Sequence, residues 1–317
     1  MELWDSIERR LLGKSRAIKE IREQIQKIAP TNYPVLISGE TGVGKTLVAE
    51  IIHELSPRAS REFIHLNCSN ISLELFESEV FGHERGAFTG AVERKKGKLE
   101  VANGGTVFLD EIGDLHPHNQ GKLLLFMDKG VFYRLGGTEK LKADVRIIAA
   151  TNKDLLFEIK HGRFRQDLYF RLSALEIHIP PLRERKEDIP VLAEEILKKE
   201  NLRMGSEKEL SPEALDKLLA HDWAGNIREL ENLLRRAMVF CDDYKIKAEE
   251  ILFNDTALIE IKEGNRLEKK NLTKEKLYEA IRQFNGNKSL AARALGISRV
   301  WLYKMLKKYD LSNIKRI

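Results

Sequence analysis

The stretch that decides the fold is GETGVGKT, formed by Gly39, Glu40, Thr41, Gly42, Val43, Gly44, Lys45 and Thr46. It directly follows the apolar run Val35–Ile37 and opens a helical pattern with apolar residues through position 52. The pattern GxxxxGK[ST] is the phosphate loop (Walker A), in which backbone N–H groups and a helix N-terminus surround phosphate oxygens. Lys45 can reach the outer phosphates, and the Thr46 hydroxyl can bind magnesium. The position between a strand and a helix makes a chance match a weak alternative, so the stretch predicts a nucleotide site.

A second acidic site follows on another apolar run. Val107–Leu109 ends in Asp110 and Glu111. Asp110 is expected to hold Mg²⁺, and Glu111 to polarise the attacking water. A strand ending in solvated acids is the alternative, and it is common when such a segment stands alone. The phosphate loop upstream favours the pairing, so the two motifs together predict a nucleotide hydrolase that uses Mg²⁺.

In the rest of the chain, strand-like and helical patterns alternate at first, and only helical patterns follow. Candidate strands at residues 34–38, 63–67, 106–110, 145–150 and 174–179 are separated by helical patterns, which predicts an α/β fold with a mostly parallel sheet covered on both faces. After Pro180 and Pro181 the pattern is wholly helical, with helix starts at Ser211-Pro212 and Gly225-Asn226. We expect an α/β nucleotide-binding subdomain at 1–181, a helical lid at 182–253, a linker at 254–271 and an all-α domain at 272–317.

Composition and charge limit the compartment and the binding partners of the chain. No apolar run approaches the roughly 20 residues that span a bilayer, so no membrane contact is expected. Cys68 and Cys241 lack metal-ligand spacing and fit buried residues of a reducing cytosol. The net charge is +5, but residues 256–317 carry 15 Lys and Arg against 6 Asp and Glu, a net +9, which leaves −4 for the remainder. A basic tail on a mildly acidic body indicates that the tail meets a polyanion.

The tail has the pattern of a helix-turn-helix. Small residues at 288–295 precede the turn Gly296–Ser298, and a basic helix is expected over 299–308. Candidate contacts to double-stranded DNA are Arg299, Trp301, Tyr303, Lys304, Lys307 and Lys308. A helical interaction module without DNA is the alternative.

A further hexapeptide is unusual for any regular element. Gly86, Ala87, Phe88, Thr89, Gly90 and Ala91 place one bulky apolar side chain among small residues, and two close glycines disfavour a helix. A surface loop that presents Phe88 to a partner explains this better than inward packing. With the phosphate site, this GAFTGA loop resembles that of the sigma-54-dependent transcription activators, which are AAA+ ATPases with a helical lid and a Fis-type helix-turn-helix. The resemblance covers nearly the whole chain and implies that the loop contacts sigma-54.

The resemblance also implies roles for single residues. Asn67 matches the switch asparagine that orients Glu111, and Asn152 matches the first sensor. Arg165 and Arg171 match arginine fingers that reach the ATP of a neighbouring subunit, and Arg228 matches the second sensor on the lid. Leu11, Leu12 and Leu182 are expected near adenine. Each has an ordinary alternative, since asparagines often cap turns, arginines often only form surface ion pairs, and Arg163 competes as a finger.

The function implied is an activator that binds enhancer DNA. It would assemble into a ring, a hexamer by analogy with the family, and hydrolyse ATP to convert the sigma-54 RNA polymerase holoenzyme from closed to open promoter complex. The alternative is a sigma-54-independent DNA-binding regulator that uses ATP for assembly; a chaperone-like or replication ATPase fits the tail less well. The family's start, near Leu12–Ser15, leaves no room for an N-terminal sensing domain. Either a trans-acting regulatory protein controls the chain or the sequence is shortened. Trp301 departs from the family pattern, and its role stays open.

Overall fold

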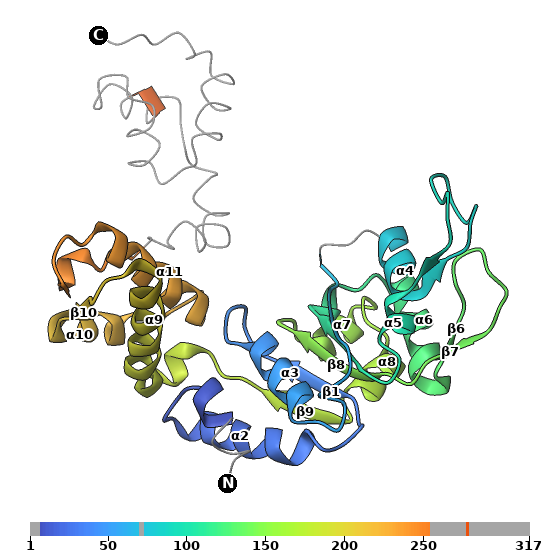
Figure 1. Cartoon of the computed structure of the whole chain (residues 1–317), viewed down its shortest axis with the longest axis horizontal. Helices are drawn as coiled ribbons and strands as arrows, with labels where there is room; N and C mark the ends of the chain where they lie inside the picture. Colours follow the sequence, from blue (N-terminus) through green and yellow to red (C-terminus); the bar gives the residue numbers. More distant parts are fainter. Residues whose placement is uncertain (1–6, 70–72, 254–276, 279–317) are drawn as a thin grey trace. The chain divides into compact units, whose positions relative to one another are not determined.

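The computed structural model describes residues 7–69, 73–253 and 277–278 (Figure 1). The chain divides into two compact units, residues 1–252 and 253–317, and nearly all the described residues lie in the first. The candidate DNA contacts lie outside the described residues: Arg299, Trp301, Tyr303, Lys304, Lys307 and Lys308.

A five-stranded parallel sheet forms the centre of the first unit. Its strand order is β2 (Phe63–Asn67), β5 (Thr106–Asp110), β8 (Arg146–Thr151), β1 (Val35–Ser38) and β9 (Leu175–His178). Every neighbouring pair is parallel. The five predicted strands and the α/β fold class are therefore confirmed, with strand ends shifted by no more than two residues.

Alternate residues of the strands face two separate cores. Leu36, Leu109 and Ala149 belong to one core, whereas Ile37, Phe108 and Ile148 belong to the other. The second core is completed by α2 (Arg16–Ile28) and α3 (Lys45–Glu54), and the first by α4 (Leu73–Phe81), α6 (Pro117–Lys129) and α8 (Gln166–Leu172). Because both faces are covered, the inner strands β1, β5 and β8 are largely apolar, as in most parallel sheets. The edge strands β2 and β9 also include the exposed residues His65, Glu176 and His178. Both cysteines are buried, and burial raises the pKa of the Cys68 thiol to about 12.

Two short antiparallel pairs project beside α4 and α6 (Figure 1). The first pair is β3 (Gly82–His83) with β4 (Lys95–Lys96), and it carries the hexapeptide loop between its strands. The second is β6 (Val131–Phe132) with β7 (Leu141–Lys142). A bridge between His83 and Leu135 joins the two projections. Shorter helices complete this part of the unit: α5 (Lys98–Val101), the 3₁₀ turn Ile112–Asp114 and α7 (Leu155–Lys160).

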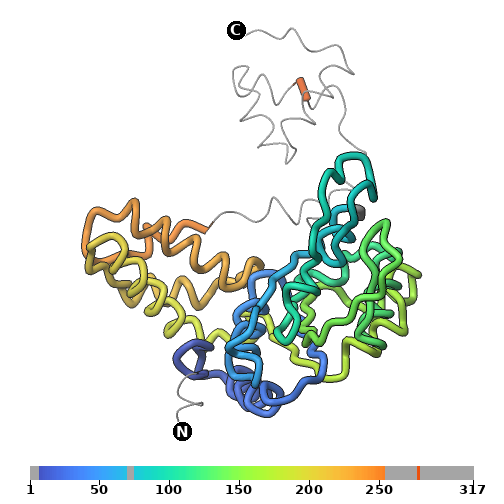
Figure 2. Tube along the Cα trace, turned by 45° about the vertical axis from the view of Figure 1, so that its right-hand side comes forward, coloured from blue at the N-terminus to red at the C-terminus, as the bar shows by residue number. Residues whose placement is uncertain are grey.

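The lid follows β9 through two 3₁₀ turns, Leu182–Glu184 and Lys186–Asp188, and packs its helices side by side (Figure 2). Its helices are α9 (Ile189–Met204), α10 (Pro212–Ala220) and α11 (Asn226–Phe240), with a last 3₁₀ turn at Ala248–Glu250. Both predicted helix starts are confirmed, and the Ser211 side chain accepts a hydrogen bond from the Ala214 N–H as an N-cap.

The prediction of a wholly helical lid is wrong in one detail. Glu209–Leu210 (β10) pairs in parallel with Lys245–Ile246 (β11). A two-residue strand is too short to show any alternation, so the sequence carries no signal for it. In the described ranges, no helix has both the length and the apolar character that crossing a membrane requires.

Candidate nucleotide site

The phosphate loop joins β1 to α3, as its sequence predicts. Lys45 is the first residue of α3, and Gly44 caps the helix with a φ of +109°. Gly42 also has a positive φ, of +83°, and a Cβ there would lie 2.5 Å from the Gly225 carbonyl oxygen. Only glycine fits this close approach of the loop to the lid. The loop therefore presents backbone N–H groups and a helix N-terminus at one edge of the sheet.

The Lys45 side chain lies inside this loop. Its Nζ donates hydrogen bonds to the carbonyl oxygens of Gly39 (2.9 Å) and Glu40 (3.2 Å). It also lies 3.6 Å from Glu111 Oε1, and its side chain is only 6% exposed. The ammonium group is thus placed between the loop and the acidic strand end, where a terminal phosphate would carry its charge.

The strand ends bring the acidic residues together. Asn67 and Asp110 end neighbouring strands and are direct partners in the register. Glu111 follows with a φ of +52°, and its N–H donates to Asp110 Oδ1 at 3.0 Å. A non-glycine residue at positive φ is uncommon and is often a functional position. The backbone turn directs Glu111 and Asp110 to different places at the same edge.

Asn152 connects the acidic edge to the phosphate loop. Its backbone N–H donates to Glu111 Oε2 at 3.1 Å, and its Nδ2 donates to the Thr41 hydroxyl at 3.0 Å. In the part of the chain that the structure describes, Asn67 makes no hydrogen bond to Glu111, and its Oδ1 accepts from the N–H and hydroxyl of Ser69. The structure therefore joins the candidate sensor to Glu111 and leaves the candidate switch asparagine one strand away.

The oxygen donors at this edge fit magnesium. Thr46 lies in the first turn of α3, which packs against β5, the strand that ends in Asp110. A hydroxyl and one carboxylate are the hard oxygen ligands that proteins offer Mg²⁺ alongside substrate phosphates. His65 was not singled out by the sequence, and its Nε2 lies 3.4 Å from Asp110 Oδ2.

The lid contributes from the other side of the phosphate loop. Arg228 lies exposed in the first turn of α11, and Leu182 is fully buried where the lid begins. The sequence analysis missed Asn226, whose side chain hydrogen-bonds the phosphate loop, and Arg183, whose guanidinium binds the Glu40 carboxylate. It also missed Asp188, which accepts hydrogen bonds from the N–H groups of Lys14 (2.5 Å) and Ser15 (2.7 Å). The wholly buried positions of Asn226 and Asp188 have no counterpart in any local sequence pattern.

The candidate arginine fingers lie at some distance along the chain from this loop. Arg165 pairs with Asp167 at 2.7 Å, and Arg171 pairs with Asp128 at 3.1 Å; both arginine side chains are 50% exposed. Among the described residues, neither arginine contacts the phosphate loop of its own chain. Arg163 makes two hydrogen bonds to Glu158, at 2.6 and 2.8 Å. Arg163 is therefore already engaged within the subunit by a carboxylate that is 11% exposed.

The hexapeptide forms a turn at the tip of its projection. Phe88 is 44% exposed, and one edge of its ring system rests against His83, with 5.0 Å between ring centroids. Thr89 is exposed, and the Gly86 N–H donates to the Ala91 carbonyl oxygen at 2.8 Å. A Cβ on Gly86 or Gly90 would meet only open space, although both have positive φ. The segment is a surface turn with a half-buried Phe88 beside the exposed Thr89.

Comparison with known proteins accounts for these features together. The model of the sigma-54 interaction domain matches residues 11–178, that of the AAA+ ATPase lid domain matches 183–258, and that of the Fis family of bacterial regulatory proteins matches 271–309. The response regulator protein PilR of Pseudomonas aeruginosa is 42% identical over 96% of this chain and 71% of its own length. The chain belongs to the sigma-54-dependent transcriptional regulators. The recognised family and the AAA+ core with lid and Fis-type helix-turn-helix are thus confirmed.

Other relatives of the regulator match it with similar identity and coverage. The Nif-specific regulatory protein of Azotobacter vinelandii is 42% identical over 92% of this chain and 57% of its own length. The transcriptional regulatory protein ZraR of Escherichia coli K12 is 42% identical over 94% and 68%. The crystal structure of NtrX from Brucella abortus in complex with ATP is similar with a TM-score of 0.72 and 36% identity, over 96% of this chain and 71% of that one. The chain thus spans 57 to 71% of the lengths of these proteins.

The base of the GAFTGA loop is held by one buried arginine of the regulator. Arg134 has a side chain only 2% exposed, and it donates to both carboxylate oxygens of Glu100, at 2.8 and 2.5 Å. It also donates to Glu84 at 2.7 Å. The Glu100 hydrogen bonds raise the pKa of Arg134. Because Glu84 lies two residues before the loop and Arg134 lies in the neighbouring projection, this network ties the two projections together.

We expect Arg134→Met to lower the free energy of unfolding by about 2–4 kcal/mol, because it leaves the Glu100 carboxylate, which is only 15% exposed, without this cation and removes the closer of two arginines from Glu84. Urea unfolding of both proteins measures the difference. Arg94→Met is the matched control: Arg94 lies 3.6 Å from the same Glu84 but is 53% exposed, so the loss should be below about 1 kcal/mol. Equal losses for the two variants would show that the burial of Arg134 adds nothing.

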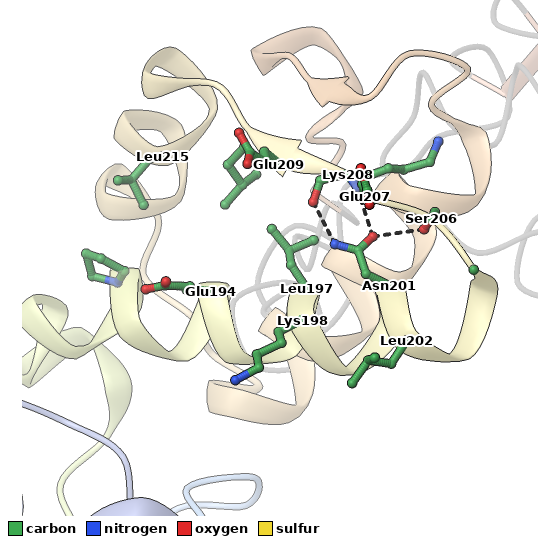
Figure 3. Close-up of a pocket in the computed structure, with 13 residues that line it drawn as sticks. Glu194, Leu197, Lys198, Asn201, Leu202, Ser206, Glu207, Lys208, Glu209 and Leu215 are labelled. Carbon is green, nitrogen blue, oxygen red and sulfur yellow. Dashed lines mark hydrogen bonds between the residues drawn. The ribbon is translucent and has the colours of Figure 1, made fainter.

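Cavities do not by themselves locate the nucleotide. A cavity of about 360 Å³ opens beside the phosphate loop and is lined in part by Gly39, Asn152 and His178. A larger cavity, of about 970 Å³, lies within the lid between α9 and β10 and includes no residue of the phosphate loop (Figure 3). The phosphate loop and acidic edge, rather than cavity size, therefore define the candidate site.

Proposed function

We propose that the regulator binds enhancer DNA and uses ATP hydrolysis to convert the sigma-54 RNA polymerase holoenzyme from closed to open promoter complex. The observation that carries the proposal is the joining of Lys45, Glu111 and Asn152 at one sheet edge, in the same compact unit as the exposed GAFTGA loop. In this proposal Glu111 polarises the attacking water and Lys45 stabilises the charge of the outer phosphates. Thr46 and Asp110 would hold Mg²⁺, which would supply positive charge to neutralise the charge that develops on the phosphates.

In this proposal the phosphate loop and the lid both contact the nucleotide. The backbone N–H groups of Gly39–Thr46 bind phosphate oxygens, and Asn152 contacts the terminal phosphate. For Asn67 to orient Glu111, as the family resemblance implies, its side chain must turn from Ser69 toward Glu111 when the nucleotide binds. Arg228 reaches the nucleotide from α11, and Leu182 contacts adenine. The structure of NtrX in complex with ATP supports the choice of nucleotide.

Assembly completes the site in this proposal. Arg165 and Arg171 act as fingers on the ATP of a neighbouring subunit in a ring, which is a hexamer by analogy with the family. Their exposure and the absence of contacts with their own phosphate loop, within the described residues, support this arrangement. The GAFTGA residues Gly86–Ala91 then contact sigma-54 in a manner that follows the nucleotide state.

The DNA-binding role belongs to the Fis-type domain. Its match at 271–309 and the net charge of +9 over residues 256–317 support binding to double-stranded enhancer DNA. We propose groove or phosphate contacts by Arg299, Tyr303, Lys304, Lys307 and Lys308, with Trp301 contacting either a thymine methyl group or its own domain. The proposed division is nucleotide-binding subdomain 1–181, lid 182–253, linker 254–271 and DNA-binding domain 272–317.

The test is association of the purified regulator with sigma-54, with and without ADP plus aluminium fluoride as a mimic of the transition state. Binding only with the mimic supports a nucleotide-gated GAFTGA loop. Absence of binding, from protein shown to hydrolyse ATP and assemble, favours the sigma-54-independent regulator.

Thr89→Ala is expected to retain ATP hydrolysis within about twofold while losing at least about tenfold in sigma-54 affinity, because Thr89 is exposed on the loop and remote from the phosphate site. Gel filtration or anisotropy with labelled sigma-54 measures the affinity. Unchanged affinity and unchanged open-complex formation would contradict the loop assignment.

A further inference from the structure

Asn226, the first residue of α11, is in an unusual position for an asparagine. It is completely buried and has a φ of +54°, in the left-handed region that few non-glycine residues adopt. Burial of an amide group costs free energy unless each of its polar atoms has a partner. A residue that is both buried and strained is retained by its contacts, so those contacts are the place to look for its role.

The side-chain hydrogen bonds of Asn226 reach both the segment that enters the lid and the phosphate loop of the nucleotide-binding subdomain. Its Oδ1 accepts from the Leu182 N–H at 2.7 Å. Its Nδ2 donates to Glu40 Oε2 at 3.0 Å and to the Thr41 carbonyl oxygen at 3.1 Å. One amide therefore joins the start of α11, the segment that enters the lid, and two residues of the phosphate loop.

The surrounding contacts leave little freedom between these elements. The Ile227 N–H donates to the Gly42 carbonyl oxygen at 3.0 Å, directly beside Asn226. Glu40 is also held by Arg183, which donates to both of its carboxylate oxygens, at 2.9 and 2.6 Å. These hydrogen bonds from Arg183 lower the pKa of Glu40, so the carboxylate stays ionised and continues to accept from Asn226.

Thr41 extends the contact toward the acidic edge. Its carbonyl oxygen accepts from Asn226, and its hydroxyl accepts from Asn152, whose own N–H binds Glu111. The lid helix thus contacts Thr41 directly, and Glu111 is connected to the same loop residue through Asn152.

We propose that Asn226 is a positioning residue of the nucleotide site, which fixes α11 and its Arg228 against the phosphate loop through Glu40 and Thr41. The inference rests on the proposed binding of ATP at this loop. Arg228 is two residues from Asn226 in the first turn of α11. A shift of the helix start therefore moves the Arg228 side chain relative to the phosphates, and errors of about 1 Å in such positions are costly.

Two substitutions separate the side chain from the backbone. Asn226→Asp keeps the shape and the acceptor for Leu182, but its carboxylate faces Glu40 and the Thr41 carbonyl oxygen without a proton to donate. Asn226→Gly removes the side chain while favouring the positive φ. Asn201→Asp is the matched control: Asn201 also makes three side-chain hydrogen bonds, but all are to Ser206 and Lys208 within the lid (Figure 3).

The measurements are the KM and kcat for ATP, and the rise in melting temperature that ADP produces. Both Asn226 variants are expected to raise KM by about tenfold or more, which corresponds to the loss of one or two hydrogen bonds. They should also lose most of the ADP-induced rise in Tm. Asn201→Asp is expected to lower the Tm without ADP while keeping both the KM and the full rise with ADP.

The outcomes distinguish the two proposals. If the unchanged chain neither binds nor hydrolyses ATP, the proposed function fails. If the unchanged chain is active and the Asn226 variants keep its KM and its response to ADP, the positioning role fails, even when their Tm is lower. Equal losses in Asn226 and Asn201 variants would also overturn it, because they would show a general effect of lid stability.

Discussion

Glu111→Gln is expected to bind ATP with unchanged affinity and to hydrolyse it at least about 100-fold more slowly, since a positioned general base contributes about 10²–10⁴ in rate. The glutamine amide keeps the size of the side chain and can still accept from the Asn152 N–H, which lies 3.1 Å from Glu111 Oε2. It cannot take up a proton from water. Steady-state hydrolysis and equilibrium binding of ATP measure the two effects separately. Glu111→Ala should give the same separation with a further loss of the Asn152 contact.

Asp114→Asn is the control for this prediction. Asp114 is three residues away, is 33% exposed and pairs with Lys153 at 2.5 Å, so its loss should change the hydrolysis rate by less than about threefold. Substantial hydrolysis by both Glu111 variants would show that another group positions the water. The candidate would then have to be sought at the same strand ends, where His65 lies 3.4 Å from Asp110.

The fold was predictable from sequence because its signals are local. The inner strands β1, β5 and β8 are largely apolar runs of four to six residues, and the phosphate loop fixes what comes before and after it. Parallel strands all end at the same edge, so Asp110 and Asn67 are expected together as soon as both strands are recognised. The positions of Lys45, Asp110 and Glu111 at one edge follow from this geometry alone.

The parts that were missed depend on residues distant in sequence. Asn226 meets Glu40 across 186 positions, and no period or spacing connects them. Arg134 and Glu100 are buried partners 34 positions apart, whereas each alone has the composition of an ordinary surface charge. The β10–β11 pair is too short to form a pattern. Such features are decided by tertiary packing, which a single sequence does not reveal.

Arg171→Ala is expected to reduce ATP hydrolysis by about 10³-fold or more while each subunit still binds ATP, because a finger supplied from outside is worth about 10³–10⁵ in rate. The same is expected of Arg165→Ala. Within the single chain, Arg171 pairs with Asp128 and also donates to the Met127 carbonyl oxygen at 3.2 Å, so assembly must exchange these contacts for phosphate oxygens. Arg163→Ala should lose less than about threefold, since the partner of Arg163, Glu158, is only 11% exposed, whereas the partners of Arg165 and Arg171 are 49% and 47% exposed.

Mixing subunits tests whether the fingers act between chains. Lys45→Ala subunits have a defective phosphate loop but intact fingers, and Arg171→Ala subunits have the reverse. Each is inactive alone, yet a mixed ring contains interfaces where a good phosphate loop faces a good finger, so hydrolysis should return in proportion to such interfaces. Light scattering at each ratio verifies that assembly is unchanged. If Arg171 served its own chain, neither type of subunit could supply a complete site, and no mixture would recover activity. Recovery therefore requires that the catalytic site span two subunits, which makes hydrolysis dependent on the ring.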